Sequence, residues 1–196
     1  MADRDAPTPA PRRVQRVIER MPMPVLHLEA EVPDPAPDWT LRVDGLVGRP
    51  LVLSVGQLQE LPTVEVSWDF HCVWGWSRRT ITWTGIQVGD LLELAGADVC
   101  ATHAVFAAVD GPYASCLDLP TAGRGLVAWA MDGQPLQPDH GAPLRFVPPP
   151  DRWAYKGVKW LGQVELLAEA RYGLWESLVG DPHGVVPPDR LELDHE

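Results

Sequence analysis

Cys72 is the residue whose type and neighbours point most directly to chemistry. It follows His71 and precedes the basic pair Arg78-Arg79, and four of the nine tryptophans fall within residues 68–83. A thiolate is both a nucleophile and a soft metal ligand, and its surroundings decide whether it reacts. The segment suits a metal or cofactor held through one sulfur, but it also suits a buried cysteine in an aromatic core. The local pattern leaves both interpretations open.

The two lysines of the chain lie close together and suggest a second functional segment. Lys156 and Lys159 surround Gly157 and Val158, whereas every other member of the 16 lysines and arginines is an arginine. Glycine lets the backbone approach a ligand closely, and a lysine ammonium is a point charge for a phosphate. The segment fits an anion site, and chance placement in an arginine-rich sequence is the alternative.

A cysteine hydrolase is another class of enzyme to weigh, with Cys72 as the nucleophile and a histidine as its base. His71 is adjacent, but neighbouring residues on a strand point to opposite faces, which counts against this pair. The sequence has no P-loop, GxGxxG, GxSxG or HExxH motif, and its six histidines are not at metal-ligand spacing. None of these enzyme classes is therefore favoured.

Composition excludes other classes of function. A net charge of −11 offers no basic surface for phosphates, so we expect no nucleic-acid partner. No apolar run approaches the roughly 20 residues that cross a bilayer, so we expect no membrane span. Cys72, Cys100 and Cys116 form neither a disulfide framework nor a zinc motif. Reduced thiols in a cytoplasmic protein are the expectation.

Strand and helix signals place Cys72 at or just beyond the end of a strand. Residues 64–68 alternate apolar and polar side chains and lead into Cys72, a kind of position from which functional side chains are often presented. Ser54 predicts the N-cap of a helix that ends at Leu61, and residues 88–94 predict a second helix that Gly96 closes. Further strands are expected at residues 41–47, 80–83, 103–109, 113–117, 126–131, 144–147 and 164–168.

These elements predict an α+β fold with mixed sheets of short strands and a few short helices, because no βαβ rhythm is present. We expect one domain at residues 25–176. Residues 1–24 are predicted to be a flexible lead-in, and residues 177–196 a loosely held tail.

Seven segments of the sequence carry a more specific pattern. They are WTLRVDGLVGRPL at 39–51, CVWGWS at 72–77, WTGI at 83–86, LLELAG at 91–96, DGQPL at 132–136, HGAPLRFVP at 140–148 and YKGVKW at 155–160. In this order and spacing they resemble the molybdopterin-binding domain of the sulfite oxidase family, over about residues 25–176. Within the family the chain is most similar to the short bacterial members, including the methionine sulfoxide reductase branch.

The resemblance implies a molybdenum–molybdopterin cofactor with Cys72 as the single protein ligand to the metal and the catalytic cysteine. A soft thiolate suits molybdenum bonded to a sulfur-rich dithiolene. The residues that the resemblance places against the pterin and its phosphate are His140, Arg145, Lys156, Gly157, Val158, Lys159, His27 and Ala108. Arg145 would grip the phosphate with its forked guanidinium, and the backbone of Gly157 and Val158 would donate hydrogen bonds to the pterin.

Some positions depart from the methionine sulfoxide reductase branch. His27 is the nearest counterpart of an asparagine there, and Ala108 stands where that branch has a threonine. Pro112 displaces Tyr113 from the family's Asp-Gly-Tyr pattern. These departures leave the expected fold and cofactor unchanged but leave the identity of the substrate open.

The resemblance implies an oxidoreductase that transfers an oxygen atom to or from a small substrate, such as a sulfoxide, sulfite or a similar oxyanion. Electrons would be exchanged with a separate redox protein. The alternative is a non-catalytic anion-binding or pterin-binding protein that retains the fold. The candidates to attract an oxyanion are Arg78, Arg79 and Arg152, with a solvated basic face as the alternative. The candidates to wall the site are Trp74, Trp76 and Trp153, with an ordinary core position as the alternative.

Overall fold

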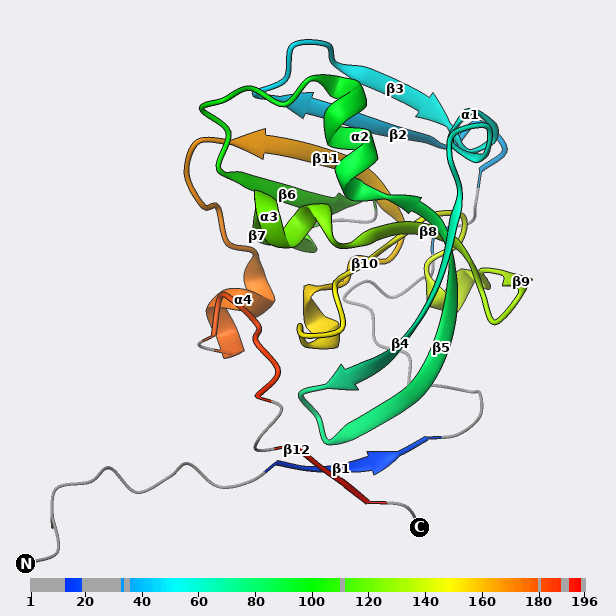
Figure 1. Cartoon of the computed structure of the whole chain (residues 1–196), viewed down its shortest axis with the longest axis vertical. Coiled ribbons are helices and arrows are strands. Elements are labelled where there is room, and N and C mark those ends of the chain that lie inside the picture. The colour runs from blue at the N-terminus through cyan, green and yellow to red at the C-terminus, as the bar shows by residue number, and fades with distance from the viewer. Residues whose placement is uncertain are drawn as a thin grey trace, which may run out of the picture.

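The fold consists of two sheets and several short helices (Figure 1). Residues of both sheets contribute to the larger hydrophobic core. The computed structural model describes residues 13–18, 33, 36–109, 112–179, 181–187 and 191–194. This arrangement is α+β, as the sequence predicts, because sheets of short strands dominate and the helices are short.

The first sheet has five strands in the order β3-β2-β11-β6-β7. Their bounds are β2 Thr40–Gly45, β3 Leu51–Ser54, β6 His103–Ala108, β7 Ala114–Asp118 and β11 Leu161–Leu167. β11 runs parallel to β2 and antiparallel to β6. Leu41 and Val43 on β2 are fully buried beneath α2 (Val88–Ala95), which lies across this sheet in Figure 1. Alternate residues of β2 therefore form the core.

The second sheet carries Cys72. Its strands are β1 Arg13–Val17, β4 Val64–Cys72, β5 Trp76–Gln87, β8 Leu126–Met131, β9 Gln134–Pro135, β10 Arg145–Val147 and β12 Leu191–Asp194. The β4–β5 hairpin reaches away from the five-stranded sheet toward β1 and β12 (Figure 1). β8 pairs with both β5 and β10. This pairing brings residues from distant parts of the sequence alongside the hairpin.

The helices are short, and Ser54 and Asp118 cap the N-termini of two of them. They are α1 Val55–Gln59, α2, α3 Leu119–Gly123 and α4 Leu174–Val179, with 3-10 turns η1 Pro138–His140 and η2 Ala154–Lys156. Ser54 and Gln57 form a reciprocal capping box at α1, and Gly96 closes α2 in the left-handed conformation. Both caps predicted from the sequence are confirmed.

The strand expected at residues 80–83 is much longer in the structure. β5 begins at Trp76, and its pairing with β4 contains an irregularity between Trp68 and Phe70. Thr80 has a positive φ of 52°, and Arg78 and Arg79 interrupt the apolar alternation. A bulge breaks the period-2 pattern without ending the strand, so the sequence pattern alone made it appear short.

Strands β1 and β12 lie in the two segments that were expected to be flexible. They pair with each other in parallel, from Arg13 opposite Leu191 to Arg16 opposite Asp194. Arg16 and Val17 also pair with Trp76 and Ser77 of β5. Strands that pair over such a distance leave no local signal in the sequence. The domain boundaries at residues 25 and 176 stay a prediction. None of the helices in the described part of the chain combines the length and the apolar character needed to cross a bilayer.

Gly45 ends β2 against the backbone of β11 and cannot be replaced without strain. Its φ is 82°, and a Cβ atom there would lie 2.3 Å from the Leu166 carbonyl oxygen. We expect Gly45→Ala to lower the free energy of unfolding by about 3 kcal/mol, through backbone strain and this clash. The matched control is Gly133→Ala, because Gly133 has a φ of 72° but no atom within 4 Å. It should lose only roughly 1–2 kcal/mol, and equal losses in urea denaturation would show that the clash is unimportant.

Candidate functional site

Cys72 is the last residue of β4, at the turn of the long hairpin. It lies opposite Trp76, and the Gly75 amide donates a hydrogen bond to the Cys72 carbonyl at 3.2 Å. Gly75 has a φ of 91°, which suits the left-handed residue of a three-residue hairpin loop. The prediction that Cys72 lies at a strand end is confirmed. The hairpin fixes the backbone of Cys72 while leaving its side chain half-buried.

The thiol of Cys72 is held in its protonated form when no metal is present. Burial raises the pKa of Cys72, and a hydrogen bond from the Trp74 backbone opposes this effect. A nearby cation would reverse the balance, because it favours the charged thiolate. The site therefore suits a cysteine that is deprotonated on binding a metal rather than a free nucleophile.

His71 has a partner other than Cys72. Its Nδ1 atom lies 2.7 Å from Ser77 Oγ, and the Ser77 hydroxyl donates to Gln15 Oε1 at 3.1 Å. Since a hydroxyl has only one hydrogen, Ser77 accepts from His71, and Nδ1 carries the proton. Burial also lowers the pKa of His71. This network uses His71 to tie the hairpin to β1, which argues further against a Cys72–His71 hydrolase pair.

Arg145 is the most unusual charge near the hairpin. Its guanidinium carbon lies 5.2 Å from the centre of the Phe70 ring and 5.4 Å from that of Trp83. Nη1 donates to the His140 carbonyl at 3.2 Å, whereas the buried Nε has no partner among the described residues. Burial lowers the pKa of Arg145 to about 10. A buried cation of this kind is ready to receive an anion.

The segments that carry His140 and Lys159 meet beside Arg145. A Cβ atom at Gly141 would lie 2.9 Å from Lys159 Cα, so glycine is needed for this close approach. Lys159 Nζ donates to the Asp139 carbonyl at 3.3 Å. Burial lowers the pKa of His140, and the charges of Arg145 and Lys159 lower it further. Arg145 and Lys159 therefore form a positively charged cluster, and the lowered pKa of His140 beside them favours its neutral imidazole.

Gly157 and Val158 are buried against β10, and their amide groups are already hydrogen-bonded within the protein. The Gly157 amide donates to the Ala154 carbonyl at 3.0 Å, and the Val158 amide donates to the Phe146 carbonyl at 3.1 Å. This differs from the expectation that both amides face the pterin. The Val158 bond instead holds the segment of Lys159 against β10, the strand that carries Arg145.

Lys156 is also placed differently from the expectation. Its side chain is fully buried and forms an ion pair with Glu176 of α4. Nζ also donates to the carbonyls of Cys116 and Pro182, so its three N–H groups are all used. Lys156 has no N–H left for a phosphate, and we remove its side chain from the candidate anion cluster.

Tyr113, just before β7, contacts the segment that leads to Lys159 through its hydroxyl group. Its hydroxyl donates to the Tyr155 carbonyl at 2.7 Å. Burial raises the pKa of Tyr113, the charge of Arg145 opposes this, and Cys72 adds to it. Both Arg145 and Cys72 are therefore within electrostatic range of the same hydroxyl group.

The three other arginines considered at the sequence level each contact an aspartate. Arg79 pairs with Asp69, and Arg152 pairs with Asp151. Arg78 donates through Nη2 to Asp132 at 2.7 Å, but its buried Nε and Nη1 have no partner among the described residues. Arg78 is thus the one of the three that keeps unused buried donors.

The tryptophans expected to wall the site divide between core and surface. Trp153 is buried with its ring nearly perpendicular to that of His71, and Trp76 is half-buried near Phe70. Trp74, at the hairpin turn, is 61% exposed and contacts Trp175 of α4. Two of the three therefore lie inside the structure beside the Cys72 hairpin.

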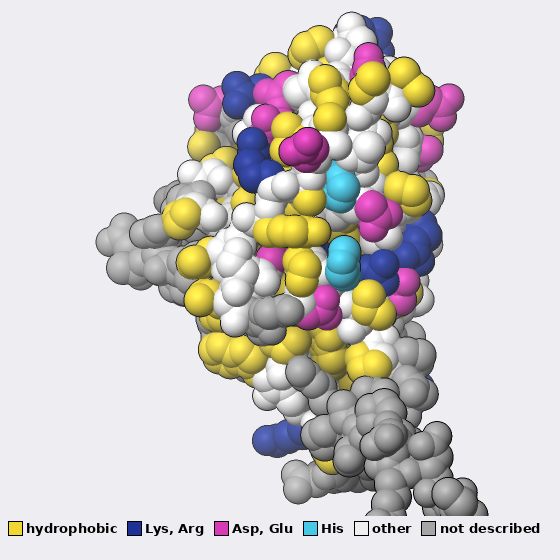
Figure 2. Space-filling view, turned by 90° about the vertical axis from the view of Figure 1, so that its left-hand side faces the viewer, with side chains coloured by type: hydrophobic (Ala, Val, Ile, Leu, Met, Phe, Trp, Pro, Cys, Tyr) yellow, Lys and Arg dark blue, Asp and Glu magenta, His cyan; other side chains and the backbone are white. Residues whose placement is uncertain are grey.

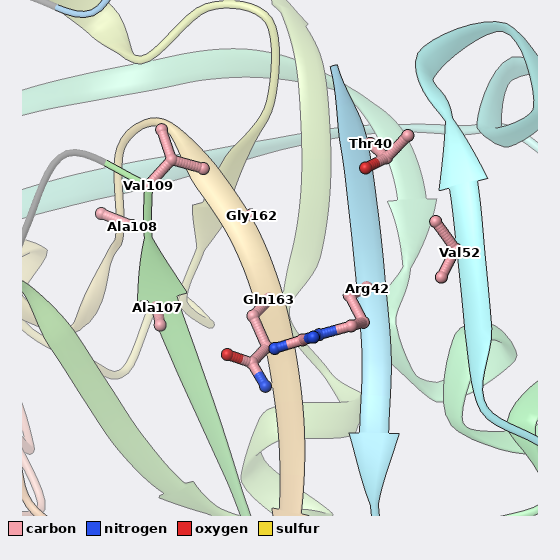
Figure 3. Close-up of a pocket in the computed structure, with 8 residues that line it drawn as sticks. All are labelled: Thr40, Arg42, Val52, Ala107, Ala108, Val109, Gly162 and Gln163. Atoms are coloured by element: carbon pink, nitrogen blue, oxygen red, sulfur yellow. The ribbon is translucent and has the colours of Figure 1, made fainter. Parts of the chain in front are cut away.

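Ala108 lies in a different setting, at an open pocket of about 530 Å³ on the five-stranded sheet (Figure 3). The pocket is lined by Thr40, Arg42, Val52, Ala107, Ala108, Val109, Gly162 and Gln163. Among these residues only Ala108 was predicted to belong to the site. Its amide donates a hydrogen bond to the Tyr113 carbonyl at 3.0 Å. A contact between Ala108 and a group at Cys72 stays a prediction, and His27 lies outside the described residues.

Two residues of this region were missed at the sequence level. Gln15 is buried and bonded to Ser77, and Glu176 is buried beside Lys156. Gln15 sits in a segment whose composition suggested flexibility, and Glu176 looks like one more acidic residue of an acidic chain. Only the tertiary contacts distinguish them.

A metal at Cys72 would need most of its ligands from a cofactor. In the part of the chain that the structure describes, no three His, Cys, Asp or Glu side chains gather where they could hold a metal ion. A single cysteine beside a cluster of cations instead suits a metal that arrives with an anionic organic group.

Comparison with known proteins agrees with this chemistry. The family described as "Oxidoreductase molybdopterin binding domain" matches residues 27–175. The chain is 37% identical to the uncharacterized oxidoreductase YuiH of Bacillus subtilis, over 81% of this chain and 83% of that protein. It is 32% identical to the protein-methionine-sulfoxide reductase catalytic subunit MsrP of Gluconobacter oxydans, over 80% of this chain and 56% of that protein.

More distant similarities have the same character. Mitochondrial sulfite oxidase of Macaca fascicularis is 30% identical over 79% of this chain, but the match covers only 34% of that protein. The sulfane dehydrogenase SoxCD of Paracoccus pantotrophus has a similar fold, with a TM-score of 0.63 at 20% identity. That similarity covers 68% of this chain and 39% of the other.

The protonated state of Cys72 can be tested by alkylation of the metal-free protein. Because burial raises the pKa of Cys72, its iodoacetamide labelling should be slow at neutral pH and rise only above the ordinary pKa of a thiol. Mass spectrometry of the Cys72 peptide measures the rate, with the exposed Cys100 as the internal reference. Labelling of both at the same rate at pH 7 would contradict this account.

The unpaired charge of Arg145 predicts an unusual effect on stability. Arg145→Met should leave the free energy of unfolding of the metal-free protein unchanged or raise it by up to about 3 kcal/mol, since it removes a buried charge without a carboxylate partner. Urea denaturation provides the measurement. Arg124→Met is the control, because its exposed pair with Asp151 is worth roughly 0–1 kcal/mol. A large loss at Arg145 would show that the guanidinium stabilises the core.

Proposed function

This chain belongs to the family of oxidoreductase molybdopterin-binding domains, and on that premise we propose that it transfers an oxygen atom to or from a small substrate. It is an oxidoreductase of this family, and its cofactor is molybdenum-bearing molybdopterin. The proposed substrate is a sulfoxide, sulfite or a similar oxyanion. The match covers 83% of YuiH but only 56% of MsrP and 34% of sulfite oxidase, so the resemblance to the latter two concerns only part of each protein.

One observation carries the proposal. A half-buried thiol ends β4, and on the same strand the Phe70 ring lies 5.2 Å from the buried Arg145 guanidinium, whose Nε has no partner among the described residues. A molybdopterin needs a soft ligand for the metal and cations for its phosphate. The residues present therefore fit the group.

Individual residues have distinct tasks in this proposal. Cys72 would hold the metal, and Arg145, with His140 and Lys159 beside it, would bind the phosphate. When bound, the cofactor supplies a metal that changes oxidation state by two electrons as an oxygen atom is transferred. Trp153 and Trp76 would limit the access of water, since both are packed beside the hairpin.

Arg78 supports an oxyanion as the substrate. It is buried, and its Nε and Nη1 groups need an acceptor that no described residue supplies. We assign electron exchange to a separate redox protein. The net charge of −11 would favour a basic partner, and the three free thiols fit a cytoplasmic location.

Metal and pterin content test the proposal directly. Protein from cells supplied with molybdate should contain about one molybdenum per chain and release a fluorescent pterin on acid oxidation, because one thiol fixes one metal. Cys72→Ser should remain folded and keep much of the pterin but lose turnover of sulfoxides, N-oxides or sulfite. Cys100→Ser is the control and should behave as the parent.

The alternative, a non-catalytic binding protein, gives a different result. If protein from molybdate-replete cells contains no metal, the proposed enzyme function is wrong. If Cys72→Ser has unchanged turnover, Cys72 is not the metal ligand.

A further inference from the structure

Lys156, three residues before Lys159, forms an ion pair with Glu176 of α4 and does not belong to the positive cluster. Glu176 accepts hydrogen bonds from Lys156, the Ser115 hydroxyl and the Cys116 amide through Oε1. Its Oε2 accepts from the Gly173 amide at 2.6 Å. Both side chains of the pair are almost completely buried. The pair therefore joins α4, β7 and the segment that leads to Lys159.

The residue of α4 that precedes Glu176 contacts the other half of the candidate site. Trp175 packs its ring edge-to-face with Trp74, with the ring centres 6.2 Å apart. Trp74 lies two residues from Cys72 in the hairpin turn. Adjacent residues of one short helix thus contact the hairpin of Cys72 and the segment of Gly157, Val158 and Lys159.

The chain that follows α4 makes further bonds to the same segment. The Tyr155 hydroxyl donates to the Asp181 carbonyl, and the Trp153 amide donates to the Gly184 carbonyl. α4 lies on the side of the molecule that faces the viewer in Figure 2, where hydrophobic side chains gather in the lower part of the described surface. Those of α4 that are exposed include Leu174 and Leu178. The helix is therefore held mainly by Trp175 and Glu176.

We propose that α4 is a clasp that fixes the two cofactor-bearing segments relative to each other, with Lys156, Glu176 and Trp175 as positioning residues. The proposal rests on the proposed function for the identity of the bound group. In this proposal Lys156 acts on the phosphate site indirectly. The ammonium holds the backbone that presents Lys159, and it does not bind the anion itself.

The electrostatics explain why this contact would act as a clasp. A buried carboxylate and a buried ammonium each have a high desolvation cost, so each is stable only in the geometry that pairs them. Movement of the Lys156 segment away from α4 would leave both charges unpaired. The segment is therefore restrained more firmly than its short backbone contacts with β10 would restrain it.

Local hydrogen exchange tests the clasp. In Glu176→Gln the amide oxygen still accepts hydrogen bonds but the charge is lost, so the Lys156 segment should open more often. The amides of Gly157 and Val158 should exchange about tenfold faster or more, while those of Val164 in β11 should not change. In Trp175→Leu the faster exchange should appear at Gly75 instead.

The controls separate a positioning role from general destabilisation. Glu165→Gln removes the partly exposed pair with Arg171 by the same chemical change and should leave Gly157 and Val158 unaffected. If Glu176→Gln does not fold, the double variant Lys156→Met/Glu176→Gln removes both buried charges and provides the same measurement. Equal acceleration at every amide, or no acceleration at Gly157 and Val158, would overturn the proposal.

Retention of the cofactor gives a second measurement. Glu176→Gln should release pterin about 10–100-fold faster than the parent, as expected when a supporting residue is lost. Release at the parent's rate would overturn the link to the cofactor. The exchange experiment uses the full-length chain as purified, whether or not it carries cofactor. Failure of the proposed function would therefore appear as absent molybdenum, and failure of the clasp as unchanged local exchange.

Discussion

A guanidinium ion packed against two aromatic rings, with one protein carbonyl as its acceptor, has a large desolvation cost. For Arg145 the pKa falls from its ordinary 12.5 to about 10, which corresponds to about 3 kcal/mol against the charged form. The surrounding residues supply partial compensation through Phe70, Trp83 and the His140 carbonyl. An anion would supply the rest. The folded protein thus maintains an unsatisfied cation at the point where three chain segments meet.

The second sheet creates this meeting point. β8 pairs with β5 on one side and with β10 on the other, so Arg145 at the start of β10 lies across from the hairpin that carries Phe70 and Cys72. β10 in turn exchanges two backbone hydrogen bonds with Val158. Each of these contacts is a backbone hydrogen-bond pairing, which fixes which residues lie opposite each other as well as which segments are adjacent. The relative placement of thiol and cation is a property of the sheet.

The two buried cations of the region differ in what accompanies them. Lys156 has a carboxylate and two carbonyls, so its donors are all used inside the protein. Arg145 has one carbonyl and no carboxylate within 4 Å among the described residues. A satisfied cation stabilises a local arrangement, whereas an unsatisfied one has binding capacity left. In the segment from Lys156 to Lys159, Lys156 therefore has a structural role, whereas Lys159 belongs to the positive cluster.

The sequence by itself determined the features whose physical cause is local. The Ser54 capping box, the Gly96 cap, the strand end at Cys72 and the ordered set of family motifs are properties of neighbouring residues. Tertiary structure alone decided that Lys156 pairs with Glu176, that Gln15 reaches Ser77, and that β1 pairs with β12. These partners lie between 20 and more than 170 positions apart. Charge and hydrogen-bond partners at such distances depend on which strands are adjacent, and no local pattern encodes that choice.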